Sequence, residues 1–351
     1  MQKNLPANRV ESLDWLRGLL AVSVMFYHLS IWLHQPLDAS SILSRLGIFS
    51  VAGFFILSGL TMAMAYHAFF FNGKQILVFF IRRIFRIWPL LWIAALLIAI
   101  ASKFQHLDVY LIFSTITTLF AFTHPAQYSI TGAWSIGNEM IYYLLTPLFL
   151  WSYNYRNWLG HLLVGFSWLI AAYFAFEALS VEVNLSDQWA VYVNPFNNLF
   201  FYASGIAIYY FFQNRKLMGS LGLTFAFVGL AILFFMPAQG NQIVLVTFWN
   251  RFVFSLALVL LVVFFYQWNI ILPRSLTYVF NLMGESAYGI YLLHPIVYTY
   301  LNWSAKKMGI ISSPFLIIFT GIFTILLAYC SYVFFEKPIM QWGKKWTSRM
   351  I

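Results

Sequence analysis

An arginine and a histidine share one face of the first long apolar segment, residues 9–33. His28 follows Arg17 by eleven residues, close to three whole turns of helix, so both side chains lie on one stripe about 16 Å apart along the axis. Polar side chains inside a membrane are costly and usually functional. We therefore predict that Arg17 binds the anionic end of an elongated ligand and that His28, the commonest general base near neutral pH, acts at its other end.

Three further arginines, Arg82, Arg83 and Arg86, lie in the run FFIRRIFRIWP, residues 79–89. Arg83 and Arg86 are three residues apart and share a helical face. Guanidinium groups match the geometry of phosphate oxygens, although such clusters also serve simply as cytoplasmic anchors. We predict that both bind an anionic ligand from the cytoplasm together with Arg17. Asp14 lies one helical turn before Arg17 and can form an ion pair with it.

A carboxylate lies inside a later apolar run, residues 134–151. Glu139 has Ser135 four residues before it, and a buried carboxylate needs a partner. If this segment enters from outside, Glu139 reaches the depth of His28 and can fix the tautomer of the imidazole. The alternative is a structural ion pair with an arginine, for example Arg251.

Tyrosine and histidine recur at three-residue spacing in SAYGIYLLHP, residues 286–295. We predict that side chains of this segment donate to an oxyanion or contact an acceptor, with ordinary packing as the alternative. The full set of such candidates is Tyr288, Tyr291, His294, Ser135 and Arg251. The histidines are otherwise scattered, so the sequence predicts no metal site.

The composition places these residues in an all-α membrane protein. Of 351 residues 62% are hydrophobic and 9% charged, whereas soluble proteins carry about a quarter charged residues. The basic residues sit in short loops, which argues against nucleic acid as a partner, and the single cysteine excludes an internal disulfide. We expect one membrane domain over residues 1–351, with ten apolar runs that approach the length of a span. They are residues 13–33, 46–66, 87–102, 134–151, 159–179, 196–212, 218–236, 244–268, 287–303 and 314–335.

Loop charges orient these segments. The loop at residues 67–86 and the tail after residue 336 are rich in Lys and Arg, so both are expected in the cytoplasm. The topology counted from the N-terminus and the topology counted back from the C-terminus agree only if residues 109–123 do not cross the membrane. We therefore predict ten spans with both termini cytoplasmic, and a re-entrant or surface-lying segment at 109–123.

Five stretches together resemble motifs of the acyltransferase-3 family of integral membrane acyltransferases. The resemblance runs in the same order over roughly residues 9–335. The matching stretches are Arg17-x10-His28, GFFILSG at 53–59, Arg83-x2-Arg86, WSIGNE at 134–139 and YGIYLLH at 288–294.

The resemblance implies an enzyme that moves an acyl group, usually acetyl, from cytoplasmic acyl-CoA to a hydroxyl of a glycan or lipid-linked sugar. It implies a catalytic His28, a CoA-binding role for Arg17, Arg83 and Arg86, and a need for Glu139. Acetyl-CoA or another acyl-CoA is then the donor substrate, with no permanently bound cofactor. Some relatives carry a fused esterase-like domain; we see none here, so direct transfer is expected. A covalent acyl-histidine is the other route.

From this we expect a multi-pass protein of the bacterial inner membrane, surrounded by lipid. Acyl-CoA would thread through one continuous cavity from Arg17 to His28, where Glu139 orients the imidazole. A different class of function, a transporter or flippase of an anionic lipid-linked substrate, could use the same buried charges. The sequence shows no internal repeat of the kind that such transporters have. It does not predict an oligomeric state.

Overall fold

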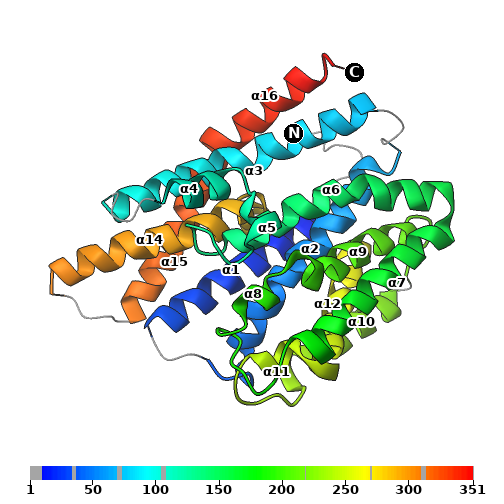
Figure 1. The fold of residues 1–351 in the computed structure, drawn as a ribbon, viewed down its shortest axis with the longest axis horizontal. Helices are drawn as coiled ribbons and strands as arrows, with labels where there is room; N and C mark the ends of the chain where they lie inside the picture. Colours follow the sequence, from blue (N-terminus) through cyan, green and yellow to red (C-terminus); the bar gives the residue numbers. More distant parts are fainter. Residues whose placement is uncertain are drawn as a thin grey trace.

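The computed structural model describes residues 10–33, 37–68, 73–103, 108–217, 219–268, 271–309 and 314–350 and consists of helices there (Figure 1). Ten long helices correspond to the ten apolar runs, so the predicted all-α fold is confirmed. They are α1 (Glu11–Leu33), α2 (Ile42–Tyr66), α3 (Gly73–Ala101), α6 (Ala133–Tyr155), α7 (Asn157–Tyr173), α9 (Pro195–Phe212), α10 (Gly219–Phe235), α12 (Phe248–Gln267), α14 (Ala287–Lys307) and α15 (Pro314–Ser331).

Among the described residues, six helices are long and apolar enough to cross a membrane. They are α1, α2, α3, α12, α7 with its π-helical end η1 (Phe174–Ala178), and α15 continued by η2 (Tyr332–Glu336) and α16 (Lys337–Thr347). Helices α6, α9 and α14 are also long, but polar and tyrosine side chains replace aliphatic ones along them. The number of crossings and the side of each terminus remain predictions.

Residues 109–123 form two short helices, α4 (Val109–Ile116) and α5 (Phe120–Thr123). Asp108 caps α4 by accepting hydrogen bonds from the amides of Tyr110 and Leu111. At 1.5 Å per residue α4 is about 12 Å long, far short of the hydrocarbon core. This geometry suits the predicted re-entrant or surface-lying segment.

Helix α3 begins earlier than predicted. The sequence placed residues 67–86 in a loop, whereas the helix starts at Gly73. Arg83 and Arg86 therefore project from the middle of a continuous helix, one turn apart. Because that helix is rigid, their separation and direction are fixed relative to the cavity described below.

Close backbone contact joins α2 to α9. A Cβ atom added at Gly59 would lie 2.0 Å from the carbonyl oxygen of Tyr202, and one added at Gly205 would lie 2.0 Å from that of Ile56. Only glycine allows the two backbones to approach so closely. The last glycine of GFFILSG therefore fixes the position of α2.

Helix α1 lies in the middle of the bundle (Figure 1) and packs against α2, α14 and the amphipathic α13 (Arg274–Glu285). Gly284 of α13 sits so close that a Cβ there would be 2.3 Å from the carbonyl oxygen of Asp14. Helices α3 and α16 run side by side along one edge of the bundle. Arg17 and His28 thus face the interior from the central helix.

Two more short helices, α8 (Trp189–Tyr192) and α11 (Ile243–Val246), lie in the loops before α9 and α12.

Candidate active site

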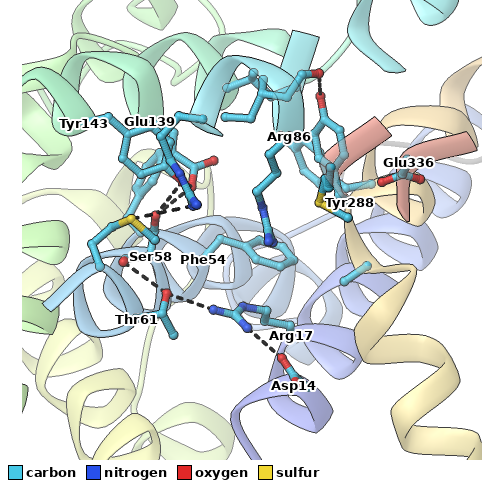
Figure 2. Close-up of a pocket in the computed structure, with 18 of the residues that line it drawn as sticks. Asp14, Arg17, Phe54, Ser58, Thr61, Arg86, Glu139, Tyr143, Tyr288 and Glu336 are labelled. Carbon is cyan, nitrogen blue, oxygen red and sulfur yellow. Dashed lines mark hydrogen bonds and ion pairs between the residues drawn. The ribbon is translucent and has the colours of Figure 1, made fainter. Parts of the chain in front are cut away.

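A cavity of about 420 Å³ lies among α1, α2, α3, α6, α13, α14 and the η2–α16 segment (Figure 2). Its volume is within the range of small-molecule sites, about 300–1,000 Å³. Seven of the candidate residues line it, although they come from four distant stretches of sequence. They are Arg17, Arg83, Arg86, Ser135, Glu139, Tyr288 and Tyr291.

Arg17 is partly neutralised within the fold. One terminal nitrogen contacts the Asp14 carboxylate at 2.7 Å, and the other donates to the hydroxyl of Thr61 at 3.0 Å. The predicted Asp14–Arg17 pair is therefore present. Its guanidinium is held at the cavity wall, and the Asp14 carboxylate already offsets part of its positive charge.

Arg83 is held even more firmly. Its guanidinium donates to the hydroxyl of Tyr66 at 3.2 Å and contacts the sulfur of Met62 at 3.7 Å. The same group lies 5.6–5.9 Å from the ring centroids of Tyr66, Phe79 and Tyr143, within the range of cation–π attraction. The aromatic rings and these two contacts hold the guanidinium in place, while its buried Nε makes no hydrogen bond within the described residues.

Arg86 differs from both. It is exposed and points into the cavity, and within the described ranges its guanidinium makes no hydrogen bond or ion pair (Figure 2). Arg86 is therefore the cation best placed to bind an incoming anion, while Arg17 and Arg83 contribute a fixed positive field beside it.

Glu139 does not contact His28, so the prediction that it orients the imidazole is wrong. Its carboxylate accepts hydrogen bonds from Ser58, at 2.6 Å, and from Tyr143. The field of Arg83 also acts on this group. Glu139 therefore belongs to the polar wall of the cavity near Arg83, together with Ser58 and Tyr143.

The alternative partner for Glu139, Arg251, lies elsewhere. It is 1% exposed, and its terminal nitrogens donate to the carbonyls of Asn197, at 2.7 Å, and Val246, at 3.2 Å. It does not line the cavity. The arrangement ties α9 to the start of α12, and the predicted acceptor role of Arg251 finds no support in this position.

The direct partner of His28 is His294 on α14. Nδ1 of His28 lies 2.9 Å from Nε2 of His294, whose Nδ1 lies 3.0 Å from the carbonyl oxygen of Ile290. Trp32 stacks on His28 with ring centroids 5.2 Å apart and planes 7° apart. His294 is 1% exposed and His28 is partly exposed. The sequence named His294 as a candidate but did not predict this pair.

The cavity stops short of the histidine pair. Neither His28 nor His294 lines it. Tyr291 does, and its ring centroid is 6.2 Å from that of His294 and 5.9 Å from that of Phe54, another lining residue. Tyr291 and Phe54 thus separate the two, and the expectation of one continuous cavity is wrong for this conformation.

The hydroxyl groups predicted to stabilise an oxyanion are engaged with the backbone. Tyr288 donates to the carbonyl of Ile87 at 2.8 Å, and Tyr291 donates to that of Gly132 at 3.0 Å. Ser135 lies 2.8 Å from the Tyr291 hydroxyl. These bonds must be exchanged before either phenol can donate to a reaction intermediate, so the oxyanion role remains a prediction.

Sequence reasoning missed two acidic residues that line the cavity, Glu285 and Glu336. Glu336 ends the π-helical turn η2, is 7% exposed and accepts a hydrogen bond from Ser331 at 3.2 Å. The field of Arg86 acts on it across the cavity (Figure 2). The sequence does carry a signal for Glu336, because it is an acidic residue at the end of an apolar run and is followed by Lys337 and a proline. Extra turns of π-helix often mark functional sites.

Comparison with known proteins identifies the family of this chain. A model described as an acyltransferase domain, that of the acyltransferase-3 family, matches residues 10–333. The chain is also 27% identical over 316 residues to the "Putative acetyltransferase ORF330" of Acidianus two-tailed virus, and the match covers 88% of each chain. No solved structure matches. With its apolar helices, the chain therefore belongs to the acyltransferase-3 family and is a membrane acyltransferase.

Proposed function

We propose that this acyltransferase moves an acetyl group from cytoplasmic acetyl-CoA to a hydroxyl of a glycan or lipid-linked sugar, with His28 as the general base. One observation carries the proposal. The three arginines and Tyr291 line the same cavity. The ring of Tyr291 lies beside His294, which is the partner of His28. The name of the viral relative supports an acetyl rather than a longer group.

The donor would bind through its phosphates. In the described part of the chain Arg86 offers a guanidinium without a hydrogen bond or ion pair, and the partly paired Arg17 and Arg83 line the same cavity. Guanidinium–phosphate bonds are charge-assisted and strong. Along the continuous helix α1 the eleven residues from Arg17 to His28 span about 16 Å, a distance that an extended pantetheine arm can cover.

The chemistry needs only two substrates and one base. The acceptor hydroxyl gives its proton to the imidazole of His28, and its oxygen attacks the carbonyl carbon of the thioester. The carbon–sulfur bond breaks, the CoA thiolate leaves, and it takes the proton back from the imidazolium. The products are an acetyl ester and free CoA thiol, so atoms and charge balance.

The donor must first pass the barrier described above. Tyr291 and Phe54 separate the cavity from the histidine pair, so their side chains must move for the thioester to reach His28. For Tyr291 this movement breaks the hydrogen bond from its hydroxyl to the carbonyl of Gly132. Binding of the anionic head at Arg86 would hold the acetyl end against these two rings until they part.

Surface glycans of cells that express the gene provide the test. Mass spectrometry should detect acetyl groups on glycans from cells with the wild-type protein and with His161→Gln, a control histidine on α7 that contacts Tyr153. Cells with His28→Gln should lack them, although the variant is present in the membrane. Unchanged acetylation with His28→Gln would refute the assignment of the base.

A second measurement separates the enzyme from the transporter alternative. Purified protein in detergent, given acetyl-CoA and a glycolipid extract of the same cells, should release free CoA thiol. A transporter would move its substrate without breaking the thioester and would release none.

A further inference from the structure

The ring of His294 is held at both of its nitrogens. The carbonyl oxygen of Ile290 can only accept, so Nδ1 of His294, 3.0 Å away, must carry a proton and donate it. The Ile290 carbonyl lies one turn before His294 on α14. The orientation of the ring is thus set by the backbone of its own helix.

The second nitrogen of His294 is then without a proton. The side chain is 1% exposed, its ring neighbours are His28, Trp32 and Tyr291, and among the residues that the structure describes it forms no ion pair with a carboxylate. A buried unpaired charge is very costly, so the ring is neutral. A neutral imidazole with a proton on Nδ1 has a lone pair on Nε2.

The contact between the rings therefore has a direction. Nε2 of His294 lies 2.9 Å from Nδ1 of His28, and since the first atom can only accept, the second must donate. Nδ1 of His28 carries the proton. Its Nε2 is left with a lone pair, and within the described ranges no side chain or backbone group donates to it.

We propose that His294 is a positioning residue that fixes His28 in the Nδ1–H tautomer, so that Nε2 of His28 is the basic atom. In familiar hydrolases an aspartate does this for the catalytic histidine; here a neutral histidine, anchored on the Ile290 carbonyl, takes its place. The role in catalysis rests on the proposed function, whereas the tautomer does not.

The same arrangement stabilises the imidazolium that forms when Nε2 takes the acceptor proton. The bond from Nδ1 of His28 to His294 becomes charge-assisted and strengthens. The Trp32 ring, stacked 5.2 Å from His28, attracts a cation through its face. Both effects grow only as positive charge develops, so they favour the transition state over the resting enzyme.

Nitrogen NMR of the full-length protein, labelled with ¹⁵N-histidine and held in detergent micelles, tests the tautomer directly. The protonated and bare nitrogens of a neutral imidazole give well-separated signals, and loss of signals in His28→Gln assigns them. We expect a proton on Nδ1 of His28 and none on Nε2. The opposite tautomer in the wild-type protein would overturn the proposal even if the enzyme is active.

Two substitutions at His294 separate positioning from mere packing. His294→Gln keeps an acceptor oxygen near the former Nε2 and should retain the tautomer and most activity, measured as CoA thiol release from acetyl-CoA with the glycolipid extract. His294→Leu removes the acceptor, should shift the proton of His28 to Nε2, and should lower kcat by about 10²–10⁴-fold with little change in KM for acetyl-CoA. An unchanged tautomer in His294→Leu would refute the inference. If that variant does not fold, the wild-type spectrum still decides.

Discussion

Removal of Arg86 should weaken donor binding without weakening the fold. Its guanidinium is exposed, points into the cavity and makes no hydrogen bond or ion pair in the described part of the chain. A hydrogen bond to a charged group contributes about 1.5–3 kcal/mol. Because solvent and salt screen an exposed group, we use the lower end, about 1.5 kcal/mol, which corresponds to roughly a tenfold increase in the Kd of CoA. Arg86→Gln should show this loss in calorimetric titration with CoA.

Arg83→Gln should behave differently, because Arg83 bonds to Tyr66 and lies over three aromatic rings. Losing a hydrogen bond and the cation–π contacts should cost about 1–3 kcal/mol of folding stability. Thermal unfolding in detergent should therefore show a lower Tm for Arg83→Gln and a nearly unchanged Tm for Arg86→Gln.

The matched control for Arg86→Gln is Arg82→Gln, which removes the same charge four residues earlier on α3. Arg82 donates to the hydroxyl of Thr347 at 2.9 Å and does not line the cavity. CoA affinity should stay within about twofold of wild type at equal salt. If Arg82→Gln weakens binding as much as Arg86→Gln, only net charge matters and the assigned role of Arg86 is refuted.

Three further predictions follow from single contacts. Glu139→Gln should leave the His28 tautomer unchanged in the ¹⁵N spectrum, since Glu139 bonds to Ser58 and Tyr143 instead; an altered tautomer would contradict this. Glu336→Gln should tighten CoA binding about two- to fivefold in calorimetry, because it removes a carboxylate that competes for Arg86; weaker binding would argue against it. Gly59→Ala should destabilise the fold by about 1–3 kcal/mol, seen as a lower Tm, because its Cβ would meet the Tyr202 carbonyl; an unchanged Tm would contradict that contact.

The sequence was most informative where one helix carries the pattern. Arg83 and Arg86 share a face by their spacing alone, and both line the cavity with Arg17. The pairing of His28 with His294 could not be predicted, because it depends on the relative depth and rotation of α1 and α14, and on a backbone carbonyl that has no sequence signature. For the same reason Glu139 was assigned the wrong partner. The hydroxyl groups of Ser58 and Tyr143 donate hydrogen bonds to the Glu139 carboxylate, and the sequence spacing between these residues and His28 does not reveal those bonds.

The buried position of Arg251 shows that a sequence pattern can also suggest a binding role where the structure shows a structural one. An arginine near the end of an apolar run suggests an anion site, but two backbone carbonyls and the ring of Phe200 surround this one. Carbonyl oxygens become available wherever helices end, and a guanidinium with five donors can satisfy several of them. Such a role depends on tertiary structure, which no local pattern of residues contains.

The barrier formed by Tyr291 and Phe54 has a consequence for the cell as well as for the reaction. In the proposed function the two substrates approach from opposite sides of a bilayer, so a passage open from Arg86 to the far side of His28 would be a pore. Ions driven by the membrane potential would then leak through it. If acyl-CoA occupies the cavity as proposed, the rings of Tyr291 and Phe54 between it and the histidines would keep this path closed to ions between turnovers.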